Sequence, residues 1–234
     1  MIRIGVVTGL AAEANCLKRF SATAPTNTPD IPLIYCAGAN AARARDGACH
    51  LVAQGAQALL SFGVAGGCDP SCRPGDLIVA KSVLSNDSPP IRCDEAWRER
   101  FTRCIAGQIS ANVAPIFGSR MAITTPREKH ALFENFGVAT VDMESAGVAT
   151  FATSAGVPFL AIRAVADPVN GNIPQAALAG ILPDGRTSAI PVLRSLLRAP
   201  HHALALVKLA SDSGRALRCL RRVAALSAPT FGLV

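Results

Sequence analysis

The apolar run at residues 159–166 constrains the fold more than any other feature of this sequence. Each of its residues is apolar except Arg163, and Asp167 and Pro168 follow directly. A strand that is covered on both faces needs apolar side chains at nearly every position, as strands of parallel sheets do. The run therefore predicts a doubly buried strand, and Pro168 ends it and restricts Asp167 to extended backbone.

Further apolar runs alternate with helical patterns along the chain, which favours an α/β fold. We expect strands at residues 2–8, 33–36, 58–64, 76–83 and 137–143, with helices after them, including 95–105, 126–133 and 144–155. Apart from the helix at 95–105, residues 84–119 give no clear pattern. A chain of 234 residues suffices for one core. We predict a single three-layer domain at residues 1–190, with a central mixed sheet flanked by helices.

The basic charge of the chain is concentrated near its C-terminal end. The net charge is +7, and residues 194–222 hold seven basic residues and one acidic residue. The remainder is therefore almost neutral, and only 5% of all residues are aromatic. A nucleic-acid surface usually combines a basic face with stacking rings. We accordingly expect no nucleic-acid partner.

Residues 191–234 form the predicted C-terminal helical extension, which is basic and amphipathic. Leu and Val recur there at helical spacing with Arg and Lys between them. Such a helix packs on its own domain or on a second subunit, or it lies on an anionic membrane. The chain shows no signal peptide and no spanning run of about 18 apolar residues. We expect a cytoplasmic protein, with peripheral contact at the inner face of the membrane as the second interpretation.

Polar side chains stand at the ends of three expected strands, where ligands bind in open α/β sheets. Asp142 and Glu144 follow one strand, and Asp167 follows another. Glu144 suits an ordinary helix cap or a carboxylate that accepts hydrogen bonds from sugar hydroxyls. The third strand ends in a Gly-rich turn around Ala65 and Gly66 that lets backbone approach a ligand. No P-loop or dinucleotide motif is present.

We predict no metal site and no cofactor. The eight cysteines include no C-x-x-C pair, and Cys68 and Cys72 lack a second Cys/His pair at zinc-site spacing.

Taken in order, four segments resemble the nucleoside phosphorylase/nucleosidase superfamily, most closely its methylthioadenosine/S-adenosylhomocysteine nucleosidase branch. They are residues 4–7 with Glu13, residues 63–67 with 74–76, residues 141–146 and residues 163–167. Residues 7–10, 167–168 and 182–186, with the Leu/Arg-rich tail, resemble the hopanoid-associated phosphorylases more narrowly. Those bacterial proteins are thought to remove adenine from adenosylhopane.

The resemblance implies specific roles for residues of this chain. Asp167 would donate a proton to N7 of the purine, so that adenine leaves as a neutral base. Glu144 would hold the ribose hydroxyls, Met143 would pack against the sugar, and Glu13 would activate water. Further residues of the substrate site would be Ala65, Gly66, Ile123 and Asp142. The resemblance also implies a small-molecule or lipid-linked nucleoside substrate and a homo-oligomer, without a cofactor.

Three positions depart from the family pattern. Val64 and Ala166 each stand where relatives often have Ser, and the segment expected to stack on adenine holds Ala122 and Ile123, without a ring. Phosphate therefore stays open as a co-substrate, with Arg43 and Arg45 as candidate ligands or as a solvated helix face. The alternatives are a phosphorylase for the same substrates, a nucleosidase for small methylthioadenosine-type substrates, and a non-catalytic nucleoside- or lipid-binding protein.

Overall fold

The computed structural model describes residues 2–21, 31–174, 177, 182, 184–186 and 203–233. Within these residues, eight strands form one sheet. The strands are β1 (Ile4–Thr8), β2 (Leu33–Cys36), β3 (Ala58–Gly67), β4 (Leu77–Leu84), β5 (Ile91–Arg92), β6 (Ala111–Gly118), β7 (Thr140–Asp142) and β8 (Phe159–Asp167). The helices are α1 (Ala11–Ser21), α2 (Ala41–Ala53), α3 (Glu95–Ile105), α4 (Pro126–Phe136), α5 (Ser145–Ala155) and α8 (Ala203–Ser227).

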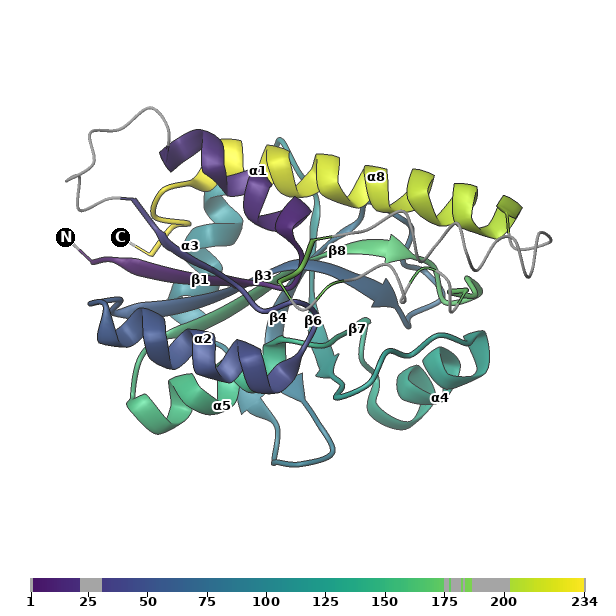
Figure 1. Ribbon diagram of the computed structural model, residues 1–234, viewed down its shortest axis with the longest axis horizontal. Helices are drawn as coiled ribbons and strands as arrows, with labels where there is room; N and C mark the ends of the chain where they lie inside the picture. The colour runs from purple at the N-terminus through teal and green to yellow at the C-terminus, as the bar shows by residue number, and fades with distance from the viewer. Residues whose placement is uncertain are drawn as a thin grey trace.

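The sheet is mixed and lies between two layers of helices, as predicted. Its path runs β2-β1-β3-β7-β6-β4-β5, and β8 pairs with both β3 and β4. The β4–β8, β3–β7 and β4–β5 pairs are antiparallel, and the others are parallel. Helices α1 and α8 lie on one side of the sheet and α2 and α5 on the other (Figure 1). The predicted three-layer α/β architecture with a C-terminal helix is confirmed.

Strand β8 is buried along its whole length, which confirms the interpretation of its apolar sequence. It runs parallel to β3, with Leu59 opposite Phe159, and antiparallel to β4, with Leu77 opposite Ala164. Because β8 has neighbouring strands on both edges and helices on both faces, neither of its faces is exposed to solvent. Nearly every position in it is therefore apolar.

Strand β6 falls within residues 84–119, where only the helix at 95–105 was predicted. Its first half is largely exposed, and Pro115 lies within it where its register with β4 shifts. Proline cannot donate to a sheet ladder, so its presence argues against a strand in a sequence pattern. The helix at 95–105 is confirmed as α3.

Helix α8 packs on the sheet through one face. Ala216, Leu220, Val223 and Ala224 are buried in the same core as the strands, and Phe231 packs there beside Phe62. Its opposite face is exposed and carries Leu204 and Val207 together with basic residues. The predicted boundary between residues 190 and 191 lies outside the described residues.

Helices α2 and α5 approach closely at Gly147. A Cβ atom at Gly147 would overlap the carbonyl oxygen of Ala41 and would lie 3.1 Å from the backbone nitrogen of Arg45. Backbone atoms cannot rotate away, so we expect Gly147→Ala to lower the free energy of unfolding by about 1–3 kcal/mol. Urea denaturation measures this change.

Gly214 in α8 provides the matched control. A Cβ atom there would meet only the end of the Arg218 side chain, at 3.6 Å. Because alanine favours helix over glycine, Gly214→Ala should stabilise the protein by about 0.5–1 kcal/mol. Equal effects of the two substitutions would contradict the close approach of α2 and α5.

Candidate active site

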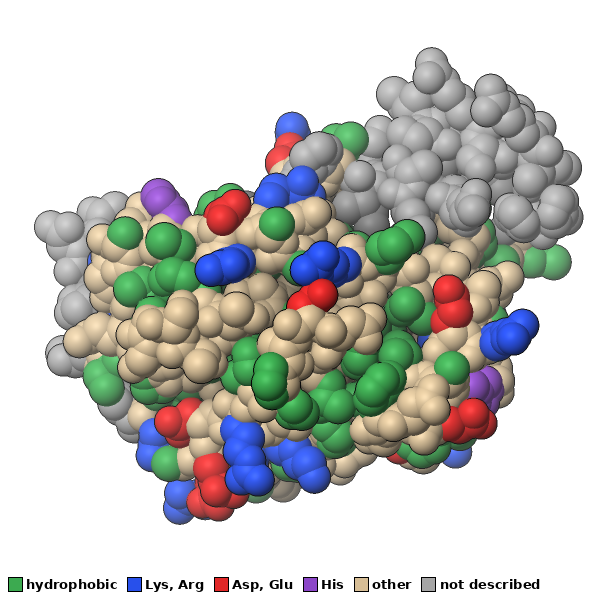
Figure 2. Space-filling view, turned by 90° about the horizontal axis from the view of Figure 1, so that it is seen from below, with side chains coloured by type: hydrophobic (Ala, Val, Ile, Leu, Met, Phe, Trp, Pro, Cys, Tyr) green, Lys and Arg blue, Asp and Glu red, His purple; other side chains and the backbone are tan. Residues whose placement is uncertain are grey.

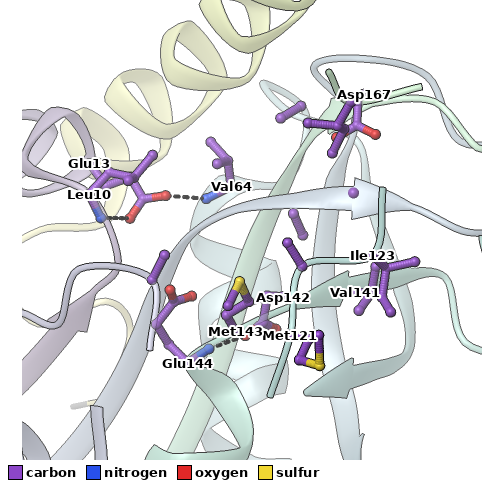
Figure 3. Close-up of a pocket in the computed structure, with 16 residues that line it drawn as sticks. Leu10, Glu13, Val64, Met121, Ile123, Val141, Asp142, Met143, Glu144 and Asp167 are labelled. Atoms are coloured by element: carbon purple, nitrogen blue, oxygen red, sulfur yellow. Dashed lines mark hydrogen bonds between the residues drawn. The ribbon is translucent and has the colours of Figure 1, made fainter. Parts of the chain in front are cut away.

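A cavity opens at the ends of β1, β3, β7 and β8 and encloses about 670 Å³ of space, part of it open to solvent. The structure brings every predicted site residue into its lining, from segments far apart in the sequence (Figure 3): Glu13, Ala65, Gly66, Ile123, Asp142, Met143, Glu144 and Asp167.

Glu13 lies in the first turn of α1 and is almost completely buried. Its Oε2 accepts hydrogen bonds from the backbone N–H groups of Gly9 and Leu10, and its Oε1 accepts one from Val64, all at 2.8 Å (Figure 3). Backbone N–H groups donate only, so they favour the carboxylate form. Burial has the larger effect and raises the pKa of Glu13.

Asp142 acts as the cap of helix α5. Its Oδ1 accepts hydrogen bonds from the N–H groups of Glu144 and Ser145, at 2.8 and 2.7 Å, and lies 3.1 Å from Arg163 Nη2. Burial opposes its charge, but Arg163 and these donors hold its pKa below the ordinary value. The side chain of Glu144 makes no capping hydrogen bond. Glu144 is therefore not the ordinary helix cap that its position would suggest.

Glu144 is buried beside two charged groups. Its Oε2 lies 3.9 Å from Arg163 Nη2, which also donates to Ser61 Oγ at 2.7 Å. Burial, and after it the charge of Asp142, raises the pKa of Glu144 to about 8 against the opposing charge of Arg163. The carboxyl group therefore holds a proton through much of the neutral range and is free to meet a ligand in the cavity.

Asp167 ends β8 on the far side of the cavity from Glu13 (Figure 3). Its Oδ2 accepts a hydrogen bond from Nζ of Lys129, a residue of α4 that is fully buried. Burial raises the pKa of Asp167, although the ammonium group of Lys129 opposes this rise. The sequence analysis missed Lys129, because a lysine near the start of a helix normally points to solvent and carries no signal of burial.

Most of the cavity lining is aliphatic. Val64, Val141 and Ile173 contribute to the wall, and Met121, which is 75% exposed, stands at its rim. None of the described lining residues is aromatic. The segment at Ala122 and Ile123, where the family pattern has a ring, contributes only aliphatic side chains to the lining.

The side chain of Arg43 hydrogen-bonds to the backbone of the loop that precedes its helix. Its Nε donates to the carbonyl oxygen of Ala37 at 2.6 Å, and its Nη2 donates to that of Gly38 at 2.7 Å. Arg45 lies in a separate cavity between α2 and α5. Among the described residues, no cluster of three or more His, Cys, Asp or Glu has the arrangement of a metal site.

Comparisons with known proteins agree with this fold. A family model described as the Phosphorylase superfamily matches residues 31–198. Futalosine hydrolase of Helicobacter pylori has a similar structure, with a TM-score of 0.71, 14% identity and 95% of each chain covered.

Two nucleosidases are similar as well. The 5′-methylthioadenosine/S-adenosylhomocysteine nucleosidase of Helicobacter pylori has a TM-score of 0.69 and 15% identity, over 95% of this chain and 97% of that one. The S-adenosylhomocysteine nucleosidase of Streptococcus pyogenes has a TM-score of 0.66 and 16% identity, over 98% of both chains. No curated protein matches the chain.

Proposed function

Because the chain belongs to the phosphorylase superfamily, we propose that it cleaves the N-glycosidic bond of an adenosyl compound and releases adenine. One observation carries this proposal: Glu13, Glu144 and Asp167 come from three distant segments and line the same cavity. The solved structures that it resembles include nucleosidases for methylthioadenosine and S-adenosylhomocysteine. We infer that each of the three carboxyl groups has a separate role in the cleavage reaction.

Asp167 is the proposed acid. Adenine is a poor leaving group as an anion, and a proton on N7 lets it leave as a neutral base. The proton passes from Asp167 to N7 while the electron pair of the C–N bond moves to the base. Burial raises the pKa of Asp167 against the opposing effect of Lys129, which favours the protonated form that this step needs.

Glu144 is the proposed partner of the sugar, and Met143 beside it packs against the ring. The sugar gains positive charge as the bond breaks, and a carboxylate stabilises that charge best where water is excluded. Glu144 is 6% exposed and lines the cavity. Arg163, which is 1% exposed, offsets part of the negative charge that Asp142, and Glu144 once it has ionised, bring to this buried site.

Water is the proposed acceptor, activated by Glu13. A phosphate ion entering this cavity would approach the carboxyl groups of Glu13 and Glu144, and none of the described lining residues is a lysine or arginine that could hold its charge. Arg43 holds backbone carbonyls instead of facing the cavity. Both observations favour hydrolysis over phosphorolysis, which remains the alternative.

Adenosylhopane is the proposed substrate, because the exposed Met121 gives the cavity an apolar rim that suits an apolar group attached to the nucleoside. The competing substrate is a small methylthioadenosine-type nucleoside. A lipid-linked substrate would place the enzyme at a membrane. None of the described helices is long and apolar enough to span one, so such contact would occur at the surface.

The exposed face of α8 is the proposed membrane contact. Leu204 and Val207 are 84% and 68% exposed, and Arg218 and Arg222 are exposed along the same side of the helix. Each basic residue near an anionic bilayer contributes about 1 kcal/mol. We expect Arg218→Glu with Arg222→Glu to lower binding to anionic vesicles at least about tenfold, as measured by liposome flotation.

The control changes the net charge equally at another place, by Arg45→Glu with Arg127→Glu, two exposed residues of α2 and α4. Equal binding by both double variants would exclude this face. Substitution is preferable to deletion of the tail, because α8 contributes Leu220 and Val223 to the core.

A homo-oligomer is also proposed. Hydrophobic side chains gather in the middle of the face that presents α2, α5 and α4 (Figure 2), where a second copy could bury them. Sedimentation of the purified protein measures this, and a monomer at high concentration would rule it out.

The deciding experiment incubates the protein with adenosylhopane and, separately, with methylthioadenosine, each with and without phosphate. Free adenine and a free sugar that form regardless of phosphate indicate a nucleosidase. A requirement for phosphate and a sugar 1-phosphate product indicate a phosphorylase. Adenine from neither substrate would favour the non-catalytic binding protein and overturn the proposal.

A further inference from the structure

Lys129 uses all of its hydrogen-bonding capacity on Asp167 and on the turn that follows it. Its Nζ donates to Asp167 Oδ2, to the carbonyl oxygen of Gly171 at 2.7 Å and to that of Pro168 at 3.3 Å. An ammonium group has three donors, and each has an acceptor here. The lysine therefore fixes both the carboxyl group and the backbone immediately after it.

The start of helix α4 holds Lys129 in this position. Thr125 and Glu128 form a capping box there, with Pro126 at the first turn. The lysine side chain is fully buried. A buried ammonium group is costly unless it is paired, so this arrangement indicates a role that offsets the cost.

The two oxygens of Asp167 have different surroundings. Oδ2 accepts a hydrogen bond from Lys129, whereas Oδ1 accepts none from the described residues. Both oxygens lie in the cavity wall near Gly66, 3.5 and 3.6 Å from the point that a Cβ atom there would occupy. A proton on Oδ2 would meet the ammonium protons, so a proton on the carboxyl group belongs on Oδ1. Oδ1 is the oxygen that Lys129 leaves free to donate this proton.

We propose that Lys129 is the positioning residue of Asp167: it directs the acidic proton to Oδ1 and stabilises the carboxylate that remains after transfer. This inference rests on the proposed function. The proton leaves Oδ1 for a ring nitrogen of the base, and the new carboxylate is neutralised by an ammonium group that keeps its own protons. Without Lys129, that charge would form in a buried site where no other cation of the described residues is in direct contact with it.

The other titratable groups near Asp167 have smaller roles. Cys68, just beyond β3, stays a neutral thiol because burial raises its pKa to about 12. Asp212 and Lys208 of α8 act on Asp167 in opposite senses and form an ion pair with each other at 2.7 Å. Of the cations in the described part of the chain, Lys129 is the one in direct contact with Asp167.

The test uses Lys129→Met, which keeps the length of the side chain and removes its charge, and Lys129→Gln as a second variant in case the first does not fold. We expect kcat to fall by about 10–100-fold, with KM nearly unchanged. Activity needs protonated Asp167, and loss of the cation raises the pKa of this group. The alkaline limb of the kcat/KM profile should therefore move to higher pH. Lys81→Met, an exposed lysine of β4, is the control.

A second measurement does not depend on turnover. Carbon-13 NMR of labelled aspartate follows the ionisation of Asp167, whose signal is assigned by its absence in Asp167→Asn. The titration midpoint should be higher in Lys129→Met than in the unchanged protein. An inactive protein with a shifted midpoint would overturn the proposed function and leave the pairing intact. An unchanged midpoint, or an unchanged pH profile in an active protein, would overturn the role of Lys129.

Discussion

Asp167→Asn should reduce the rate of adenine release by about 10²–10⁴-fold, the usual contribution of a positioned acid. Asparagine keeps the shape of the side chain but has no proton of suitable acidity for N7. Binding should change less, because the other residues that line the cavity remain. Single-turnover assays with methylthioadenosine or adenosylhopane measure the chemical step directly. Asp46→Asn, an exposed position on α2, should leave the rate unchanged.

The same substitution should also destabilise the protein. It leaves the ammonium group of Lys129 buried without its anion, and breaking a buried pair in this way costs about 3–5 kcal/mol. Adding Lys129→Met to Asp167→Asn should restore much of that stability without restoring activity. A double variant that recovers activity as well would show that Asp167 acts through folding alone, and it would remove the acid from the proposed mechanism.

Glu144→Gln should lower activity by roughly 10²-fold, the scale of losing one preorganised electrostatic contact in a catalytic site. Glutamine still accepts a hydrogen bond from a sugar hydroxyl, but it carries no charge to stabilise the cationic sugar. The activity of the unchanged protein should rise with pH toward about 8, where Glu144 ionises, until Asp167 loses its proton. The variant should lack this rising limb.

Although Glu144→Gln should lower activity, it should raise the stability of the protein at high pH. The pKa of Glu144 is about 8 in the folded protein, against an ordinary value of 4.5, so the folded state binds the proton more tightly. Stability contributed by the protonated group is fully present below pH 4.5 and is lost as the pH rises through 8. Glutamine does not ionise, so the variant does not lose stability as the pH rises.

The melting temperature of Glu144→Gln should therefore exceed that of the unchanged protein by on the order of 5 °C at pH 9, and by little at pH 4.5. Differential scanning calorimetry at the two pH values provides the comparison. A melting temperature at pH 9 that is lower in the variant would mean that the ionised Glu144 stabilises the fold.

A strand of the sheet could be predicted from the sequence where its burial requires apolar residues at most positions. β8 is buried on both faces, and its sequence shows it, whereas β6 is half exposed and contains Pro115. The convergence of Glu144 and Asp167 was predictable, because strand ends in an α/β sheet gather at one edge. Glu13 was expected there from the family resemblance.

Features that depend on tertiary partners could not be predicted. Lys129 is buried only because Asp167 and the turn after it supply acceptors from another part of the chain. The capping of α5 by Asp142 instead of Glu144 depends on a short strand that ends at Asp142 and on the side chain of Arg163. A single sequence carries no trace of such pairings.

The central position of β8 has a consequence for the order in which the molecule assembles. Its partners β3 and β4 come much earlier in the chain, with Leu59 opposite Phe159 and Leu77 opposite Ala164. Contacts between such distant segments form slowly, and Asp167 reaches the cavity only when β8 is in place. Partly folded chains that lack this strand would have no binding site. A nucleoside ligand would then bind only the completed fold and protect it against unfolding in proportion to its concentration.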